Sequence, residues 1–141
     1  MDTTTITNPW AAVASLVDRL HGVTPALSAL ADEAPVLLRA TQDESAWVAP
    51  GVAASEAARF ADAATAARQA ADRLQIAAVI SVIATDAHHL DHARTTRAWL
   101  AHHHGVSPGT AAVWCRAAET CGRYPAAATA FFAGTITVAH L

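Results

Sequence analysis

The sequence predicts an all-α protein with one long central helix and short C-terminal helices that include a helix-turn-helix-like hairpin. Hydrophobic residues make up 53% of the 141 residues, and much of this share is alanine, the strongest helix former. Runs of β-branched residues are few, and proline and glycine stand where helices begin and end, as in Asn8-Pro9. We therefore expect roughly six or seven helices in about one domain.

The N-terminal part is predicted to be a pair of helices followed by a loop. Asn8-Pro9 begins the first helix and Gly22 ends it, and Thr24-Pro25 begins the second. Residues 41–52 are the best loop candidate, because they collect polar residues, proline and glycine. We divide the chain into residues 1–52 and 53–141, and we expect both parts to belong to one structural unit.

One long helix is predicted from Ser55 to about Asp86, a stretch without proline or glycine. Its second half carries apolar residues at the helical spacing i, i+3, i+4 and i+7, whereas no clean heptad runs through its alanine-rich first half. The longest strongly apolar run, 76–84, has nine residues. A membrane span needs about twenty, so we expect a buried core helix and no contact with a membrane.

Four short segments are predicted to follow the long helix. Residues 87–95 form a polar hinge rich in histidine, and a helix runs from Thr96 to His104. A second helix begins at Ser107-Pro108 and ends near Cys121, and a third spans 125–132. Thr137 is the N-cap of a further helix that the chain barely enters, so the sequence reads as if it stops within a domain.

Charge is unevenly distributed along the chain, whose net charge is −3. Residues 1–86 hold five arginines and ten acidic residues, whereas residues 87–141 hold four arginines, two acidic residues and seven of the eight histidines. A nucleic-acid contact is therefore expected in the second half. Cys115 and Cys121 lie too far apart on one helix for a disulfide, and no secretory signal is present at the N-terminus, so we expect reduced thiols and a cytoplasmic protein.

Residues 100–114 fit a helix-turn-helix. Ala101 is the small residue where the helices cross, Gly105 makes the tight turn, and Val106 follows as the apolar residue. His104 stands where an apolar residue is usual, and the second helix is poor in side chains that read bases. A purely structural hairpin is the alternative to DNA docking. The candidate nucleic-acid-binding residues are Arg94, Arg97, Ser107, Thr110 and Arg116.

His88 and His92 are the candidate metal ligands, because a spacing of four residues places two histidines on one helical face. A metal site would need a third ligand, and the alternative is that a hinge collects polar residues. The string Leu90-Asp91-His92 is similar to the first part of an HNH nuclease motif, but no asparagine or second metal histidine follows at suitable spacing. We expect no catalytic residue, no metal and no cofactor in this chain.

Four segments of the second half together resemble a known family. They are residues 95–100 (TTRAWL), 106–111 (VSPGTA), 124–128 (YPAAA) and 133–140 (AGTITVAH). Their order resembles the domain of unknown function called the 13E12-repeat family, over about residues 57–141. The resemblance implies a helical domain that precedes an HNH endonuclease motif, and it makes this chain look like a truncated copy. The chain departs from the family at 111–115 (AAVWC), where relatives tend to be rich in arginine.

Two functions from different classes follow from these patterns. The first is a non-catalytic N-terminal domain of an HNH-endonuclease-type protein that positions DNA or a partner. The second is a helical protein–protein or self-association module without DNA binding, pairing with a second copy or a partner helix. An exposed stripe along the long helix would favour the second function. A third possibility, a partly molten remnant, predicts weak and non-cooperative unfolding.

Overall fold

The computed structural model describes residues 9–36, 39 and 50–141, and it divides the chain into two compact units, Met1–Pro50 and Gly51–Leu141. The described residues form five α-helices and two short 3-10 helices, with no strand among them, which confirms the predicted all-α class. None of the helices described here is long and apolar enough to cross a membrane.

In the described part of unit 1, α1 (Pro9–Glu33) is one unbroken helix, so the predicted end of a helix at Gly22 and start of a second at Thr24-Pro25 are wrong. The helix runs through Gly22 and Pro25 without ending. Pro25 lacks an N–H group and so removes one backbone hydrogen bond, but the preceding turn is held by the Thr24 hydroxyl, which donates to the Leu20 carbonyl at 2.8 Å. Of the predicted loop, residues 41–49 lie outside the described residues, and residues 50–52 already belong to the next helix.

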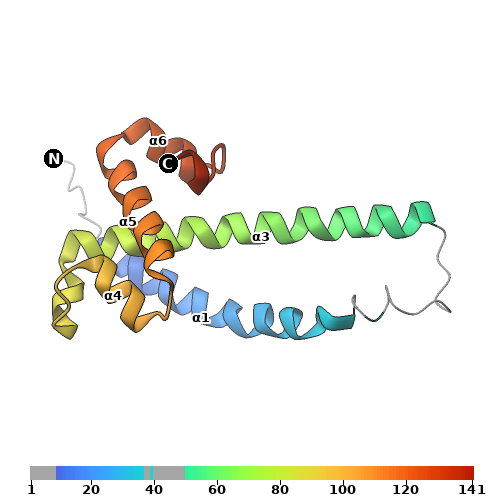
Figure 1. Cartoon of the computed structure of the whole chain (residues 1–141), viewed down its shortest axis with the longest axis horizontal. Coiled ribbons are helices and arrows are strands. Elements are labelled where there is room, and N and C mark those ends of the chain that lie inside the picture. The colour runs from blue at the N-terminus through green and yellow to red at the C-terminus, as the bar shows by residue number, and fades with distance from the viewer. Residues whose placement is uncertain (1–8, 37–38, 40–49) are drawn as a thin grey trace, which may run out of the picture. The chain divides into compact units, whose positions relative to one another are not determined.

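The long helix α3 (Pro50–Thr85) is the main element of unit 2 and confirms the predicted long helix, which begins five residues earlier than expected. Pro50 occupies the first helical position, where its missing N–H has no partner to lose. The described side chains as far as Arg68 are all exposed, whereas Ile76 and Val79 are buried. Figure 1 shows the shorter helices of unit 2 gathered beside the C-terminal part of α3.

The remaining elements of unit 2 match the predicted order. They are η1 (Ala87–Asp91), α4 (Thr96–His103), α5 (Pro108–Arg123), α6 (Pro125–Phe132) and η2 (Val138–His140). Helix α5 continues through Gly122, two residues beyond its predicted end. It ends where Tyr124 turns to an extended conformation, with φ of −124° and ψ of 90°, because the residue before a proline is disfavoured in the helical region.

The core of unit 2 is small and partly built from alanine. Its buried apolar residues are Ile76, Val79, Leu100, Ala111, Ala117, Ala118, Cys121 and Phe131, drawn from α3, α4, α5 and α6. Both cysteines, Cys115 and Cys121, are free thiols. Because alanine buries little area, the larger side chains supply most of the hydrophobic free energy. Leu141 packs against this core, and its carbonyl accepts a hydrogen bond from the Thr120 hydroxyl at 3.2 Å.

Gly105 is expected to be required by the turn between α4 and α5. Its φ is +61°, a left-handed conformation that a side chain disfavours. Gly105→Ala should therefore lower the free energy of unfolding by about 1 kcal/mol. Gly122→Ala is the matched control, because Gly122 is helical and no atom lies within 4 Å of an added Cβ, so this change should stabilise by about 0.5 kcal/mol. Urea unfolding measures both, and equal effects of the two changes would contradict the assignment of the turn.

Candidate nucleic-acid interface

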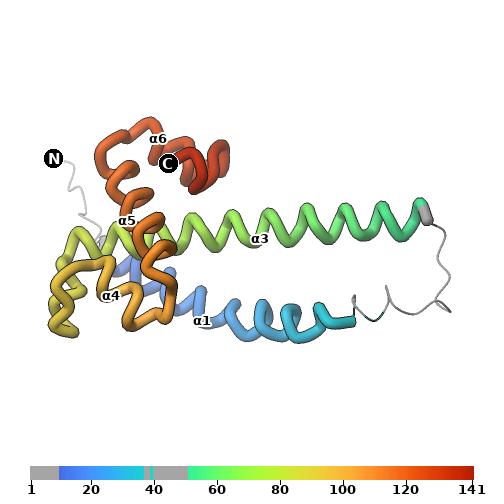
Figure 2. The backbone as a smooth tube through the Cα atoms, in the orientation of Figure 1, coloured from blue at the N-terminus to red at the C-terminus, as the bar shows by residue number. Residues whose placement is uncertain are grey.

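The α4–α5 hairpin has the features predicted for a helix-turn-helix. Leu100 and Ala111 are buried, Gly105 adopts the left-handed turn, and Val106 and Trp114 pack against the core while partly exposed. Figure 2 traces the backbone from α4 through this turn into α5. Ala101, the small residue expected where the helices cross, is half-buried and packs against the core, and the buried Ala111 of α5 is equally small, so the two helices can approach closely.

Two of the candidate nucleic-acid residues, Ser107 and Thr110, form the start of α5. The Ser107 Oγ accepts a hydrogen bond from the backbone N–H of Thr110 at 3.0 Å, and the two hydroxyl oxygens are 2.9 Å apart. This is an N-cap, which satisfies a backbone N–H that has no partner within the helix. Thr95 caps α4 in the same way, accepting from the N–H of Ala98 at 3.1 Å. The hydroxyls of Ser107 and Thr110 therefore orient α5.

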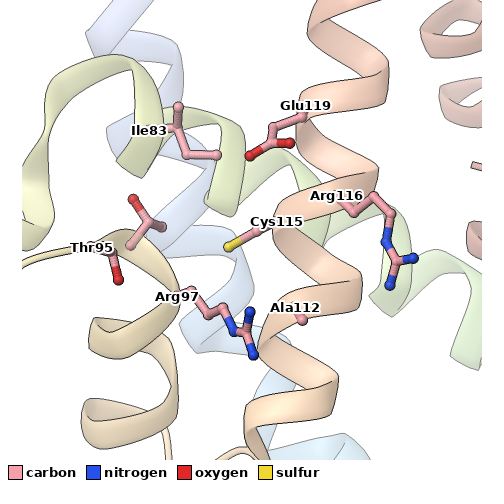
Figure 3. Close-up of a pocket in the computed structure, with 8 residues that line it drawn as sticks. Ile83, Thr95, Arg97, Ala112, Cys115, Arg116 and Glu119 are labelled. Carbon is pink, nitrogen blue, oxygen red and sulfur yellow. The ribbon is translucent and has the colours of Figure 1, made fainter.

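Two further candidates, Arg97 and Arg116, line one open pocket of about 500 Å³ between the end of α3, the start of α4 and the middle of α5. The pocket lining is completed by Ile83, Thr95, Thr96, Ala112, Cys115 and Glu119. Figure 3 shows Arg97 extending toward α5 near Ala112, with Glu119 farther along α5. The two arginines lie 19 positions apart in the sequence and line the same pocket, and Figure 3 shows the Arg116 side chain pointing away from Arg97 on the other side of α5. Arg94 is exposed just before α4 and does not line this pocket.

The pocket arginines differ in their ion pairing from two of the three arginines of α3, Arg59 and Arg68. In α3, Arg59 pairs with Glu56 at 2.9 Å and Arg68 pairs with Asp72 at 3.0 Å. Within the described residues, neither arginine of the pocket has a carboxylate within the 4.0 Å limit of an ion pair. An exposed arginine without a carboxylate partner has its N–H donors available for an external anion.

The Cys115 thiol in the pocket is held in its protonated form. Burial raises the pKa of the Cys115 thiol above its usual value, the Glu119 carboxylate adds to the increase, and Arg97 opposes it. The pKa of Cys121 is also raised, because burial disfavours the thiolate. Since the thiolate is the nucleophilic form of cysteine, neither side chain is set up for nucleophilic catalysis at neutral pH.

The candidate metal ligands His88 and His92 do not share an α-helical face. His88 is the one buried polar residue among those described, and its Nδ1 lies 3.3 Å from the Thr96 hydroxyl. His92 follows the 3-10 helix η1 with a left-handed φ of 57°, and its side chain is exposed. No group of three or more potential ligands is found in the part of the chain that the structure describes.

A cluster around Trp99 was not predicted from the sequence. The Trp99 indole N–H donates to the Asp91 carboxylate at 2.7 Å, and the His103 Nε2 lies 3.5 Å from the same oxygen. The Trp99 ring also packs against the rings of His103 and His104. The spacing of four residues between Trp99 and His103 could have indicated their contact on α4, but no local pattern indicated Asp91. These contacts connect η1 to α4. They also occupy the carboxylate of Asp91, the acidic residue of the Leu90-Asp91-His92 string.

The exposed surface of α5 offers few groups that could read bases. Helix α5 contains no asparagine, glutamine or lysine, and its exposed side chains include Val113, Arg116, Glu119 and Arg123. Base readout in the major groove depends on arginine, lysine, asparagine or glutamine at several positions. The hairpin is therefore better equipped to contact phosphates, which arginine does without regard to sequence.

Comparison of the chain with protein-family models, with curated proteins and with solved structures finds no match. The functional conclusion therefore rests on the hairpin itself and on the charges that it carries.

Proposed function

We propose that this chain is a non-catalytic helical domain that contacts the backbone of DNA through the α4–α5 hairpin, as an accessory domain of an HNH-endonuclease-type protein of the 13E12-repeat kind. The observation that carries the proposal is the pair Arg97 and Arg116, which line one open pocket and have no ion-pair partner among the described residues. The resemblance of the four C-terminal segments to that family supports the link to a nuclease.

The distribution of charge supports this choice of surface. Residues 87–141 have four arginines and two acidic residues, and one of these acids, Asp91, is already engaged by Trp99 and His103. The rest of the chain is acidic, so an anionic duplex would be repelled elsewhere and attracted to the hairpin. Glu119 lies in the same pocket and limits the attraction. The expected contact is therefore weak, dependent on salt and independent of base sequence.

No cutting step is assigned to this chain. Its thiols are protonated, its histidines lie in no cluster of three ligands among the described residues, and Asp91 is engaged in a hydrogen bond to Trp99. In the proposed protein, hydrolysis belongs to an HNH motif outside these residues, and the hairpin supplies affinity and position.

Loss of the two pocket arginines should weaken DNA binding. Fluorescence anisotropy of a labelled duplex at low salt is expected to show a Kd on the order of 10 µM for the unchanged chain. The double change R97Q/R116Q should raise this Kd about tenfold and make the dependence of log K on log salt shallower by about 2, because two phosphate contacts are lost.

The matched control is R59Q/R68Q, which removes the same charge from two arginines that are already ion-paired on α3. This control should bind within about twofold of the unchanged chain. No binding at high micromolar protein, or an equal loss in both double variants, would overturn the proposal. An absence of binding would leave self-association as the remaining function. An equal loss in both double variants would mean that DNA binding depends only on the net charge of the chain.

A further inference from the structure

An exposed apolar stripe follows one side of α3. Its members are Ala53, Ala57, Phe60, Ala64, Ala67, Ala71, Leu74 and Ala78, which follow each other at alternating steps of four and three residues. All eight are exposed, and the two large side chains, Phe60 and Leu74, keep 54% and 44% of their surface accessible. Alternating steps of three and four are the spacing of a helix-pairing seam, which becomes visible here only when the alanines are counted as apolar.

The stripe points away from the core of unit 2. The buried residues Ile76 and Val79, with the half-buried Asp72, Arg73 and Ile80, lie on the opposite side of α3. Near its C-terminal end the stripe comes close to α6, because Leu74 and Phe132 line one open pocket. From Ala53 to Ala71 the members of the stripe are exposed, and an amphipathic helix of this kind is stabilised when its apolar face is covered.

We propose that the stripe pairs with the stripe of a second copy of this chain, with the two α3 helices antiparallel. The register is the one in which facing residues have numbers that add up to 131. Phe60 then faces Ala71 of the second copy, Leu74 faces Ala57 of the second copy, and Ala64 faces Ala67 of the second copy. Each large side chain meets a small one, so the helices can approach evenly along the seam.

A parallel pair of the same stripes would fit less well. It would place Phe60 against Phe60 and Leu74 against Leu74, while the six alanines would face alanines. The Phe60 pair and the Leu74 pair would hold the helices apart, and the alanine pairs between them would lose contact. The sizes of the side chains therefore favour the antiparallel register.

The flanking charges and the buried area are also compatible with self-pairing. The positions that flank the antiparallel seam pair with sums of 133 on one side and 129 on the other, so Glu56 lies beside Ala77 and Arg68 beside Ala61 of the second copy, and no like charges meet. The paired region from 53 to 78 is about 39 Å long. It would bury roughly 1,200 Å² in total, which is the lower bound for specific interfaces. The expected dimer is therefore weak, with a Kd on the order of 10 to 100 µM.

Sedimentation equilibrium of the full chain tests whether two copies pair through the α3 stripe. The unchanged chain should pass from monomer to dimer as its concentration rises through the range of that Kd. A64E/A71E places two charges in the seam and should be monomeric throughout, whereas A58E/A66E adds the same charges to exposed positions outside the stripe and should dimerise normally. A chain that stays monomeric, or an equal loss in both variants, would overturn the proposal and mean that something else covers the stripe.

Disulfide trapping tests the register, in a background in which Cys115 and Cys121 are changed to alanine. A53C/A78C should form a covalent dimer on mild oxidation, because these positions face each other in the antiparallel pair and lie roughly 37 Å apart within one helix. A53C alone should form no covalent dimer, because residue 53 faces Ala78 of the second copy. Cross-linking of A53C alone would show a parallel pair and overturn the register. The inference does not rest on the proposed DNA contact, since all these variants keep Arg97 and Arg116.

Discussion

Phe131→Ala should lower the free energy of unfolding by about 3 to 5 kcal/mol, the largest single loss we expect in this protein. Phe131 lies in α6, keeps 1% of its surface accessible, and is the largest fully buried side chain among the described residues. Half of the buried apolar core consists of alanine and cysteine, which cannot move to fill a phenyl-sized cavity. Since domains of this size have a total stability of roughly 5 to 15 kcal/mol, much of unit 2 should unfold at moderate urea.

Phe132→Ala is the control for this change, because Phe132 is the next residue in the chain and 42% exposed. Its ring lies edge-on to that of Phe131, with centroids 5.2 Å apart, so we expect a loss of about 1 kcal/mol from that contact. Urea unfolding followed by circular dichroism compares the two variants. Similar midpoints for both would mean that α6 does not insert Phe131 into the core, and the fold of unit 2 would then need revision.

Ala111→Leu should be the second most harmful substitution, with a loss of about 1 to 3 kcal/mol. Ala111 is fully buried in the first turn of α5, and its methyl group belongs to the same core cluster as Leu100 of α4. Three additional carbon atoms cannot be placed there unless the two helices move apart. The change should therefore lower the melting temperature, and it should also weaken any DNA contact by the hairpin.

Ala112→Leu separates this effect from a general effect of leucine on helix α5. Ala112 is half-buried and lines the open pocket of about 500 Å³, so a larger side chain can extend into that space. We expect a change in unfolding free energy within about 0.5 kcal/mol. Thermal unfolding of both variants provides the comparison. Equal destabilisation by the neighbouring leucines would show that the close approach of α4 and α5 at Ala111 is not the cause.

Local rules of helix formation were sufficient to predict most of unit 2. Ser107-Pro108 and Pro125 begin α5 and α6 where expected, because an N-cap hydroxyl and a proline at the first position act within a single turn. Gly105 makes the predicted turn with its positive φ. The long helix also follows from local properties, since it needs only helix-forming residues and an apolar spacing that buries Ile76.

The same local rules gave wrong helix ends where a glycine or proline lies within a segment that otherwise favours helix. Gly22 and Pro25 indicated the end of one helix and the start of another, yet α1 continues through both. A glycine and a proline each weaken a helix, but each removes only a small part of its hydrogen bonds, so neither must end it. In the same way, α5 continues past Cys121 because Gly122 can remain helical, and the chain leaves the helix only before Pro125.

The sequence by itself determined that the protein is helical, where α4, α5 and α6 begin, and that positive charge gathers in residues 87–141. Only the tertiary structure decided that Arg97 and Arg116 line one pocket, that Asp91 accepts a hydrogen bond from Trp99, and that the α3 stripe is exposed from Ala53 to Ala71. The physical reason is range: caps, turns and helix propensity act over a few residues, whereas the contacts of a site depend on how helices distant in sequence pack.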